Sequence, residues 1–334
     1  MNTMSNLAAV CLSVVFSLAT NEVTAQGIEV KQLEVSYYAR DYQNIDQLLS
    51  QPKRPLTIDE QLLKLAVTIQ RDEDGAESAL ELFVQQHSAN AKVQYWAGQL
   101  WLTLAKRSSI FGKMSKFSRY VSATTTAAKL APDNARYQME AAKAYGQPSM
   151  MGGDPGKQQP IVDKLRKIDS PFSQIAYMDY LQNTQNKSQG IEYALEVAKA
   201  YSTNVEVVER AGQLMWTFEN KLMAGQAFWQ ACQLPASEYE AFIKWETACW
   251  LVANFSLDGE MSVSNGVIAA ERLRQNSHVK DQDYQEALLL LAQLYTKAGH
   301  REKAISTYRE LREKAFTRTL KKQANKALRK LNAG

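Results

Sequence analysis

The run that comes closest to a reactive motif in this chain is Gly152-Gly153-Asp154-Pro155-Gly156-Lys157, which is glycine-rich and ends in a lysine. Such a loop could cradle a phosphate, because glycines let backbone N–H groups approach its oxygens and the lysine neutralises charge. The run lacks the four-residue spacer and the Ser or Thr that a phosphate loop requires. It is typical of a structural turn, with Asp154 as the cap and Pro155 as the first residue of a helix.

Other patterns for catalysis or metal binding do not occur in the sequence. His87, His278 and His300 stand far apart, and neither an HExxH nor a Cys-x-x-Cys spacing is present. No Gly-x-Ser-x-Gly nucleophile elbow exists either. The sequence therefore predicts a protein that is not an enzyme, with no catalytic residues, no metal and no cofactor.

Binding through shape is the remaining chemistry, and polar and aromatic residues on the faces of predicted helices are its candidates. Their mixed charge argues against a purely acidic or purely basic ligand. Glu209, Gln213 and Trp216 combine an aromatic with polar groups along one face, as binding hot spots do, although Trp216 would fit between helices equally well. The groove candidates are Tyr95, Gln99, Arg136, Lys143, Asp179, Gln182, Glu209, Gln213, Trp216, Trp245, Glu286 and Gln293.

The elements that must position these residues are paired helices. Between Leu288 and Leu311, bulky and small residues at helical spacing are followed by a turn at Gly299 and a second face with Ala304 and Tyr308. This is the tetratricopeptide pattern, in which a small residue on the first helix lets the second approach closely. The same order recurs from Val208 to Pro235.

Weaker copies extend the pattern over most of the chain. The equivalent positions Gly98, Ala142, Met178, Gly212, Ala248 and Ala292 step by 44, 36, 34, 36 and 44 residues. The usual step is about 34 residues, so the two long steps predict turn-rich insertions, which we place at Lys106–Lys116 and Phe255–Gly266. A further copy is expected over Gln61–Asn90. Periodicity thus predicts six or seven helix pairs.

The chain is expected to end in a capping helix at about 315–332. An apolar stripe of Phe316, Leu320, Ala324, Leu328 and Leu331 would close the last repeat, while the other faces are basic. From Arg301 onward eleven basic residues oppose three acidic ones. A solvated cap is the simplest interpretation of this charge, and weak contact with an anionic surface is the alternative. The predicted fold is an all-α, right-handed superhelix of tetratricopeptide type in a single domain, 26–334.

A more specific resemblance is carried by three segments. They are Ser109-Ile110-Phe111-Gly112, Ala127–Asn134 and Pro148-Ser149-Met150-Met151-Gly152-Gly153-Asp154. Together they resemble exported bacterial tetratricopeptide-repeat proteins that carry a Pro-x-x-x-Gly-Gly loop, and the resemblance implies a periplasmic protein without assigned chemistry. Pro160 departs from that family, which predicts that the helix after the loop starts late.

The first 25 residues are expected to be a signal peptide. Leu7–Ala19 carries no charge and is too short to span a bilayer, and Val23-Thr24-Ala25 supplies small residues for cleavage after Ala25. The preceding MNTMSN has no Lys or Arg, which leaves an N-terminal extension as the alternative. Removal of this segment would leave Cys232 and Cys249, which we expect to be free thiols because antiparallel helices from a common turn would stagger them.

These features predict a periplasmic or secreted scaffold that binds a protein or peptide partner in the groove of its superhelix. We expect no nucleic-acid partner and no stable membrane anchor. Two alternatives remain open: a structural component of an envelope assembly, joined through its convex face or ends, and an enzyme framed by the repeats.

Overall fold

The computed structural model describes residues 30, 32–37, 40–50, 55–168, 170–236, 239–276 and 282–333. The predicted signal peptide, 1–25, lies outside these residues, as does His278. The chain divides into two compact units, Met1–Glu73 and Asp74–Gly334. The boundary falls within the copy predicted over Gln61–Asn90, between its two helices, whereas the sequence predicts a single domain. Each unit is described by itself.

The first unit contains α2 (Tyr42–Leu49) and α3 (Ile58–Gln70). A capping box starts α3, because the Thr57 side chain accepts from the Glu60 amide while the Glu60 carboxylate accepts from the Thr57 amide. Buried apolar residues of the unit include Ile45 and Leu62. Arg71, just after α3, forms an ion pair of 2.6 Å with Asp46 of α2, which ties the two helices together.

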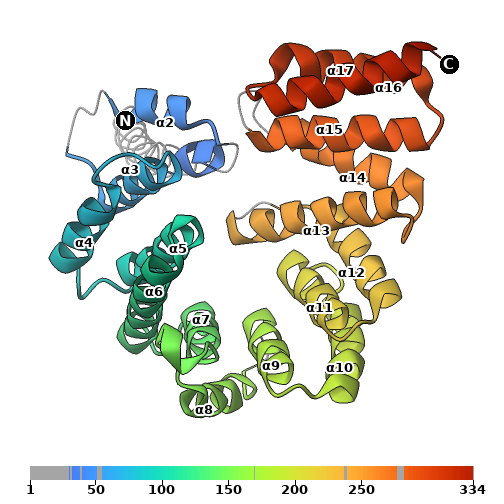
Figure 1. Cartoon of the computed structure of the whole chain (residues 1–334). Coiled ribbons are helices and arrows are strands. Elements are labelled where there is room, and N and C mark those ends of the chain that lie inside the picture. The colour runs from blue at the N-terminus through green and yellow to red at the C-terminus, as the bar shows by residue number, and fades with distance from the viewer. Residues whose placement is uncertain are drawn as a thin grey trace, which may run out of the picture. The chain divides into compact units, whose positions relative to one another are not determined.

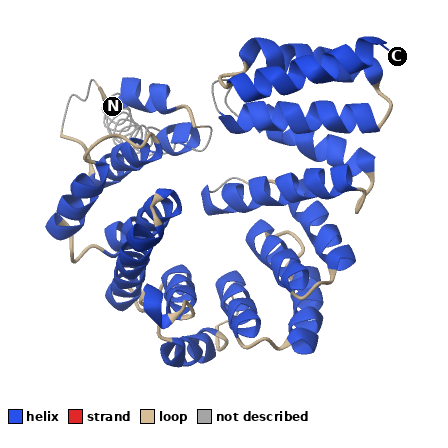
Figure 2. Ribbon diagram, viewed as in Figure 1, coloured by secondary structure: helices blue, strands red, loops and turns tan. Residues whose placement is uncertain are grey.

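The second unit is a succession of helices (Figure 1), and every described element of the chain is helix or loop (Figure 2). The all-α prediction is confirmed. Consecutive helices pack as six pairs from α5–α6 to α15–α16, and α17 closes the last pair. The helices are α4 (Ala76–Gln86), α5 (Ala91–Arg107), α6 (Ile110–Leu130), α7 (Ala135–Tyr145), the 3₁₀ turn η1 (Ser149–Met151), α8 (Pro155–Leu165), α9 (Pro171–Asn183), α10 (Lys187–Ala200), α11 (Val205–Thr217), α12 (Lys221–Gln233), α13 (Tyr239–Asp258), α14 (Val263–Asn276), α15 (Gln282–Lys297), α16 (Arg301–Lys314) and α17 (Arg318–Ala333).

Asparagine marks the start of many of these helices. Its side-chain oxygen accepts a hydrogen bond from the backbone amide three residues on, which satisfies a donor that has no partner within the helix. The capping residues of this kind are Asn90, Asn134, Asn186, Asn204 and Asn220, which begin α5, α7, α10, α11 and α12. The repeated caps therefore set the phase of each helix and of the faces it buries.

Small residues at the predicted positions let the paired helices approach closely. A Cβ added to Gly212 of α11 would lie 2.7 Å from the Phe228 ring of α12, and one added to Gly98 of α5 would lie 2.5 Å from Thr124 Oγ1 of α6. Ala142, Ala248 and Ala292 are fully buried at the equivalent sites. The steric reason for the repeat pattern is thus visible in the structure.

The two predicted turn-rich insertions are wrong in form. The first places its extra residues in helix: α5 runs to Arg107 and α6 begins at Ile110, so only Ser108 and Ser109 separate them. The second lengthens α13, which extends to Asp258 before a short turn to Val263. Serine and glycine in these segments suggest loops, but packing along the partner helix outweighs their weak helix propensity.

Both glycines of the Gly152-Gly153 loop meet a conformational or steric requirement. Gly152 has φ +86°, and a Cβ on Gly153 would lie 1.7 Å from the Gln147 carbonyl oxygen, so each glycine is required for its own reason. Asp154 and Pro155 begin α8 as predicted. The late start expected from Pro160 is wrong, because α8 runs from Pro155 to Leu165 with Pro160 inside it. Pro160 is the sixth residue of α8, so the helix continues through it without the hydrogen bond that an N–H at this position would donate to the Gly156 carbonyl.

The capping helix α17 starts at Arg318 and buries Leu320, Ala324 and Leu328, as the predicted stripe requires. Phe316 does not belong to that stripe: it precedes the helix and is 62% exposed. Its backbone amide donates to Gln285 Oε1 at 2.8 Å, which turns the chain away from the helical phase. Among the described residues no helix has the length and apolar character needed to cross a membrane.

The prediction of free thiols is wrong, because a disulfide joins Cys232 of α12 to Cys249 of α13, with their Cα atoms 4.8 Å apart. The chain leaves α12 in extended conformation at Leu234, and α13 begins at Tyr239. Extended backbone rises more than twice as far per residue as a helix, so the extended conformation at Leu234 changes the offset that a purely helical count gives for Cys232 and Cys249.

Candidate functional site

The first helices of four successive pairs form a polar pocket. Neighbouring first helices contact one another, α7 with α9, α9 with α11 and α11 with α13, and Figure 1 shows them along the inner side of the second unit, with α8, α10 and α12 outside. The pocket between them has a volume of about 240 Å³. Its lining residues are Met139, Glu140, Lys143, Gln147, Ile175, Asp179, Gln182, Asn183, Glu206, Arg210, Gln213 and Lys244.

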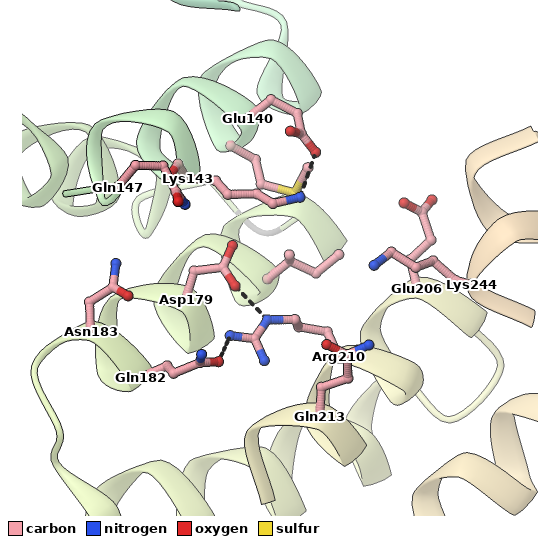
Figure 3. Close-up of a pocket in the computed structure, with 12 residues that line it drawn as sticks. Glu140, Lys143, Gln147, Asp179, Gln182, Asn183, Glu206, Arg210, Gln213 and Lys244 are labelled. Carbon is pink, nitrogen blue, oxygen red and sulfur yellow. Dashed lines mark hydrogen bonds and ion pairs between the residues drawn. The ribbon is translucent and has the colours of Figure 1, made fainter. Parts of the chain in front are cut away.

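Arg210 of α11 is the central side chain of this pocket. Its Nε forms an ion pair with the Asp179 carboxylate of α9, and its Nη2 donates to Gln182 Oε1 at 2.6 Å (Figure 3). The side chains of Arg210 and Asp179 are only 10% and 12% exposed. Because a buried charge is stable only when it is paired and hydrogen-bonded, this arrangement fixes both side chains.

A second ion pair holds α11 against α7. The two terminal nitrogens of Arg136 donate to the two carboxylate oxygens of Glu206, at 3.1 and 2.8 Å. The guanidinium also lies 4.4 Å from the centre of the Phe172 ring of α9. A bidentate pair of this kind restricts orientation as well as distance, so three first helices are held at fixed positions along the pocket.

Glu209 brings α13 into the same network. Its side chain is fully buried, it accepts from Gln213 Nε2, and Lys244 Nζ of α13 lies 3.4 Å from Glu209 Oε2. Burial of this carboxylate would be costly without the lysine. Lys244 thus neutralises Glu209 while it lines the pocket.

Glu140 and Lys143 form the wall supplied by α7. Lys143 Nζ lies 3.6 Å from Glu140 Oε1, and Gln99 of α5 donates to the other oxygen of Glu140 at 3.5 Å. The Glu140 charge raises the pKa of Lys143 above its ordinary value, so the lysine remains cationic at neutral pH. Burial, reinforced by the Glu140 charge, raises the pKa of the Tyr120 hydroxyl well above its ordinary value.

The pocket leaves two polar atoms at its centre without a hydrogen bond. Asp179 Oδ2 and Arg210 Nη1 are shielded from solvent and have no hydrogen-bond partner among the described residues. One is an acceptor and the other a donor, and each needs a partner if it is to remain buried at low cost. No cluster of three His, Cys, Asp or Glu side chains suited to a metal ion occurs in the described parts of the chain. The geometry therefore fits a polar ligand that offers both a donor and an acceptor.

The structure brings together part of the predicted groove set. Lys143, Asp179, Gln182 and Gln213 line the pocket. Three more residues contact the lining side chains: Gln99, Arg136 and Glu209.

The other five predicted groove residues lie elsewhere. Tyr95 is buried and stacks on Tyr137 at 4.8 Å between ring centres. Trp245 is buried and donates to the Cys232 carbonyl at 2.9 Å. Trp216 is 37% exposed and stacks on Phe255 at 4.5 Å, so it belongs partly to the core and partly to the surface. Glu286 and Gln293 lie on α15, away from the pocket lining.

Sequence reasoning missed four charged residues of the pocket: Glu140, Glu206, Arg210 and Lys244. Part of the signal was available, because Glu206, Arg210 and Gln213 are spaced four and three residues apart on one helical face, as are Arg136, Glu140 and Lys143. On α11, a register shifted by one residue from the one that selects Glu209 would have found Glu206 and Arg210, and on α7 Glu140 lies on the face that Arg136 and Lys143 already define. The pairing of Arg136 with Glu206, 70 residues apart, has no local signal.

Comparisons with known proteins add little to this description. No protein-family model matches the chain, and no curated protein matches it. Among solved structures, the human IFIT1 dimer with PPP-AAAA is similar to this chain. The match covers 89% of this chain and 68% of the IFIT1 chain, at 14% sequence identity and a TM-score of 0.43. The class of the protein is therefore taken from its own helix pairs: it has the fold of a tetratricopeptide-like helical repeat protein.

Proposed function

We propose that this protein is a non-catalytic scaffold and that the pocket on α7, α9, α11 and α13 binds an extended peptide segment of a protein partner. The observation that carries the proposal is the buried Arg210–Asp179 pair, which leaves one donor and one acceptor without a hydrogen bond. A peptide backbone presents C=O and N–H groups side by side, and these are the acceptor that Arg210 Nη1 lacks and the donor that Asp179 Oδ2 lacks.

The charge of the site supports a peptide over a polyanion. Four acidic side chains, Glu140, Asp179, Glu206 and Glu209, stand against four basic ones, Arg136, Lys143, Arg210 and Lys244. A nucleic acid would meet these carboxylates as well as the cations and would gain little from counterion release. Side-chain amides such as Gln147, Gln182 and Asn183 also line the pocket, and amides offer both donors and acceptors to a neutral backbone.

The same proposal includes export to a periplasmic or extracellular compartment after removal of residues 1–25. The Cys232–Cys249 disulfide supports it, because disulfides persist in oxidising compartments and are rare where thiols are kept reduced. N-terminal sequencing of the protein isolated from its native cells should find Gln26 first. Retention of Met1 in the isolated protein would contradict export by cleavage.

Selection of peptides by the purified protein tests the binding site. The pocket variant is Asp179→Leu/Arg210→Met, which replaces the buried pair by apolar residues and so removes both charges without leaving either alone. The control is Lys187→Gln/Glu219→Gln, which removes an exposed ion pair of 3.2 Å outside the pocket. A random-peptide phage library is panned on the wild-type protein, and the enriched peptides are then measured on all three proteins.

The expected result is that wild type and control bind the enriched peptides equally, whereas the pocket variant binds them at least about tenfold more weakly, which corresponds to about 1.4 kcal/mol. Unchanged affinity of the pocket variant would place binding elsewhere. Failure of the wild-type protein to enrich any peptide would contradict the proposal as a whole.

A further inference from the structure

The pair α5–α6 has a charge composition unlike the pocket helices. No Asp or Glu occurs from residue 82 to residue 132, a stretch that contains both helices entire. The same stretch contains seven basic residues: Lys92, Lys106, Arg107, Lys113, Lys116, Arg119 and Lys129. A surface of one sign attracts partners of the opposite sign over several ångströms, so this helix pair favours an anionic partner.

The start of α6 combines this charge with unusual apolar exposure. Phe111 is 86% exposed and Ile110 76% exposed, and Phe111 is the most exposed large apolar side chain among the described residues. Met114, one turn further along, is 36% exposed. These three residues lie at spacings of one, three and four on a helix, so they form one continuous patch. We call this set, Ile110, Phe111 and Met114, the α6 tip.

The α6 tip projects because α6 is longer than the core it covers. The helix has 21 residues, and its first buried residue is Tyr120, so the part from Ile110 to Arg119 buries no side chain fully. These are the extra residues that make the Gly98-to-Ala142 step long. The repeat therefore lengthens into a helical end whose residues Ile110, Phe111 and Met114 are exposed.

The basic residues near the α6 tip divide into two groups. Lys116 forms an ion pair of 2.8 Å with Glu77 of α4, and Arg119 forms one with Glu81. Lys106, in the last turn of α5, and Lys113, two residues after Phe111, form no ion pair within the part of the chain that the structure describes. Two cations thus stand close in sequence to the exposed apolar side chains without an internal partner.

We propose that the α6 tip docks on the surface of a bilayer rich in anionic phospholipid. Ile110 and Phe111 enter the boundary between headgroups and acyl chains, Met114 follows at its edge, and Lys106 and Lys113 bind the phosphate-level charge. An interfacial site needs both elements, apolar side chains for insertion and cations for attraction. Nucleic acid would satisfy the lysines, but aliphatic Ile110 and Met114 gain little from stacking on bases.

Vesicle binding by the purified protein tests the proposal. Co-sedimentation is measured with vesicles of phosphatidylglycerol and phosphatidylcholine and with vesicles of phosphatidylcholine alone. The apolar variant is Ile110→Ser/Phe111→Ser, with Leu222→Ser as its control, because Leu222 is also exposed, at 68%, but lies on α12. The charge variant is Lys106→Glu/Lys113→Glu, with Lys321→Glu/Lys322→Glu on the basic helix α17 as its control.

The wild-type protein should bind the anionic vesicles and not the neutral ones. Each α6 variant should weaken that binding by about tenfold or more, whereas both controls retain it. Melting followed by circular dichroism should be unchanged in all four variants, because every altered side chain is exposed or has no partner in the fold. In addition, the emission of a Phe111→Trp variant should shift to shorter wavelength when anionic vesicles are added.

Several outcomes would overturn the proposal. Equal binding to neutral and anionic vesicles would show that the lysines do not contribute to binding. Loss of binding in the α17 control but not in the α6 variants would show that α17, and not α6, contacts the membrane. A protein that ignores vesicles yet binds single-stranded RNA or DNA through Lys106 and Lys113 would identify nucleic acid as the partner. Self-association that disappears with Ile110→Ser/Phe111→Ser would identify a second copy of the chain.

Discussion

The pocket helices and the α5–α6 pair are built from the same kind of repeat, but they carry charge in opposite ways. In the pocket, Arg210, Arg136 and Lys244 each meet a carboxylate supplied by a helix of the same row. On α5 and α6 no carboxylate exists, and only α4 supplies partners for Lys116 and Arg119. Charges that are neutralised by neighbouring repeats stabilise the fold. Charges without a partner in the fold are available to bind another molecule.

Removal of Arg210 alone should have the largest effect on stability. Arg210→Met leaves Asp179 buried without its cation, and breaking a buried pair in this way costs about 3–5 kcal/mol of unfolding free energy. The double variant Asp179→Leu/Arg210→Met should recover most of the loss. Urea unfolding of the single and the double variant measures the two free energies of unfolding. The control is Lys113→Met, next to the exposed α6 tip, whose free energy of unfolding should stay within about 0.5 kcal/mol of wild type. Equal losses of stability in Arg210→Met and Lys113→Met would show that the paired charges of the pocket stabilise the fold no more than the unpaired charges of α6.

The disulfide should contribute the next largest effect, because it fastens α12 to the pocket helix α13. The closed loop spans 17 residues of sequence separation, and loops of that size contribute about 3 kcal/mol by restricting the unfolded chain. Cys232→Ser/Cys249→Ser should therefore lower the urea midpoint. Reductant should lower the urea midpoint of the wild type but not that of the double variant, which has no disulfide to reduce. A wild-type protein whose intact mass does not change on reduction and alkylation would contradict the bond.

Substitution of Gly212 should destabilise the packing behind the pocket by a smaller amount. A Cβ at this position would overlap the Phe228 ring, at 2.7 Å, and overpacking of a core costs about 1–3 kcal/mol. Thermal unfolding of Gly212→Ala measures the loss. Gly156→Ala is the control, since its Cβ would come no closer than 3.4 Å to another atom. Equal stability of the two variants would show that close approach at Gly212 is not required.

The smallest effect is expected at Glu310, a partly exposed counterpart of the pocket carboxylates. Burial raises the pKa of Glu310, but hydrogen bonds from Tyr284 and Lys314 and the charge of Arg274 outweigh it, so the pKa is lowered overall. A carboxylate with a lowered folded-state pKa contributes stability above its unfolded pKa, near 4.3, and loses it as pH falls through the folded value.

Tyr284→Phe should therefore reduce this acid-sensitive part of the stability, because it removes the 2.6 Å hydrogen bond to Glu310. Melting temperatures from neutral pH down to about pH 3 measure the change, in a range where carboxylates of this kind become protonated. The two proteins should differ at neutral pH and converge toward acid. A difference that stays constant across the range would assign the effect of Tyr284 to packing alone.

The fold could be predicted from the sequence to the extent that it depends on local spacing. Gly212, Ala248 and Ala292 occur where paired helices cross. Only a small side chain fits at each crossing, so the spacing of small residues in the sequence gives the repeat length. The lengthened α5 and α6 could not be predicted in that way, since Ser108, Ser109 and Gly112 favour turns locally while the partner helix decides the outcome. The disulfide was missed because it depends on where α13 begins relative to the end of α12, and helical rise alone does not give that position.

The candidate site was predictable only in part, for a related reason. A helical register places Asp179 and Gln182 on one face, so their position could be predicted within their own repeat. Arg210 and Glu206 stand among buried valines of α11, where the pattern favours core, and their partners come from other repeats. Such pairs depend on how successive repeats stack, and the period of a single repeat contains no information about that.

The most direct test of the central claim, that a peptide binds where the first helices meet, is site-specific photocrosslinking. A photoreactive p-benzoylphenylalanine is placed at Gln182, which lines the pocket, and separately at Leu222, which is exposed on α12 outside it. Each protein is irradiated with a peptide selected by the wild type, and the product is mapped by mass spectrometry. The account predicts a crosslink from position 182 that excess unlabelled peptide suppresses, and none from position 222. Equal yields from the two positions, or a crosslink from position 222 alone, would contradict it.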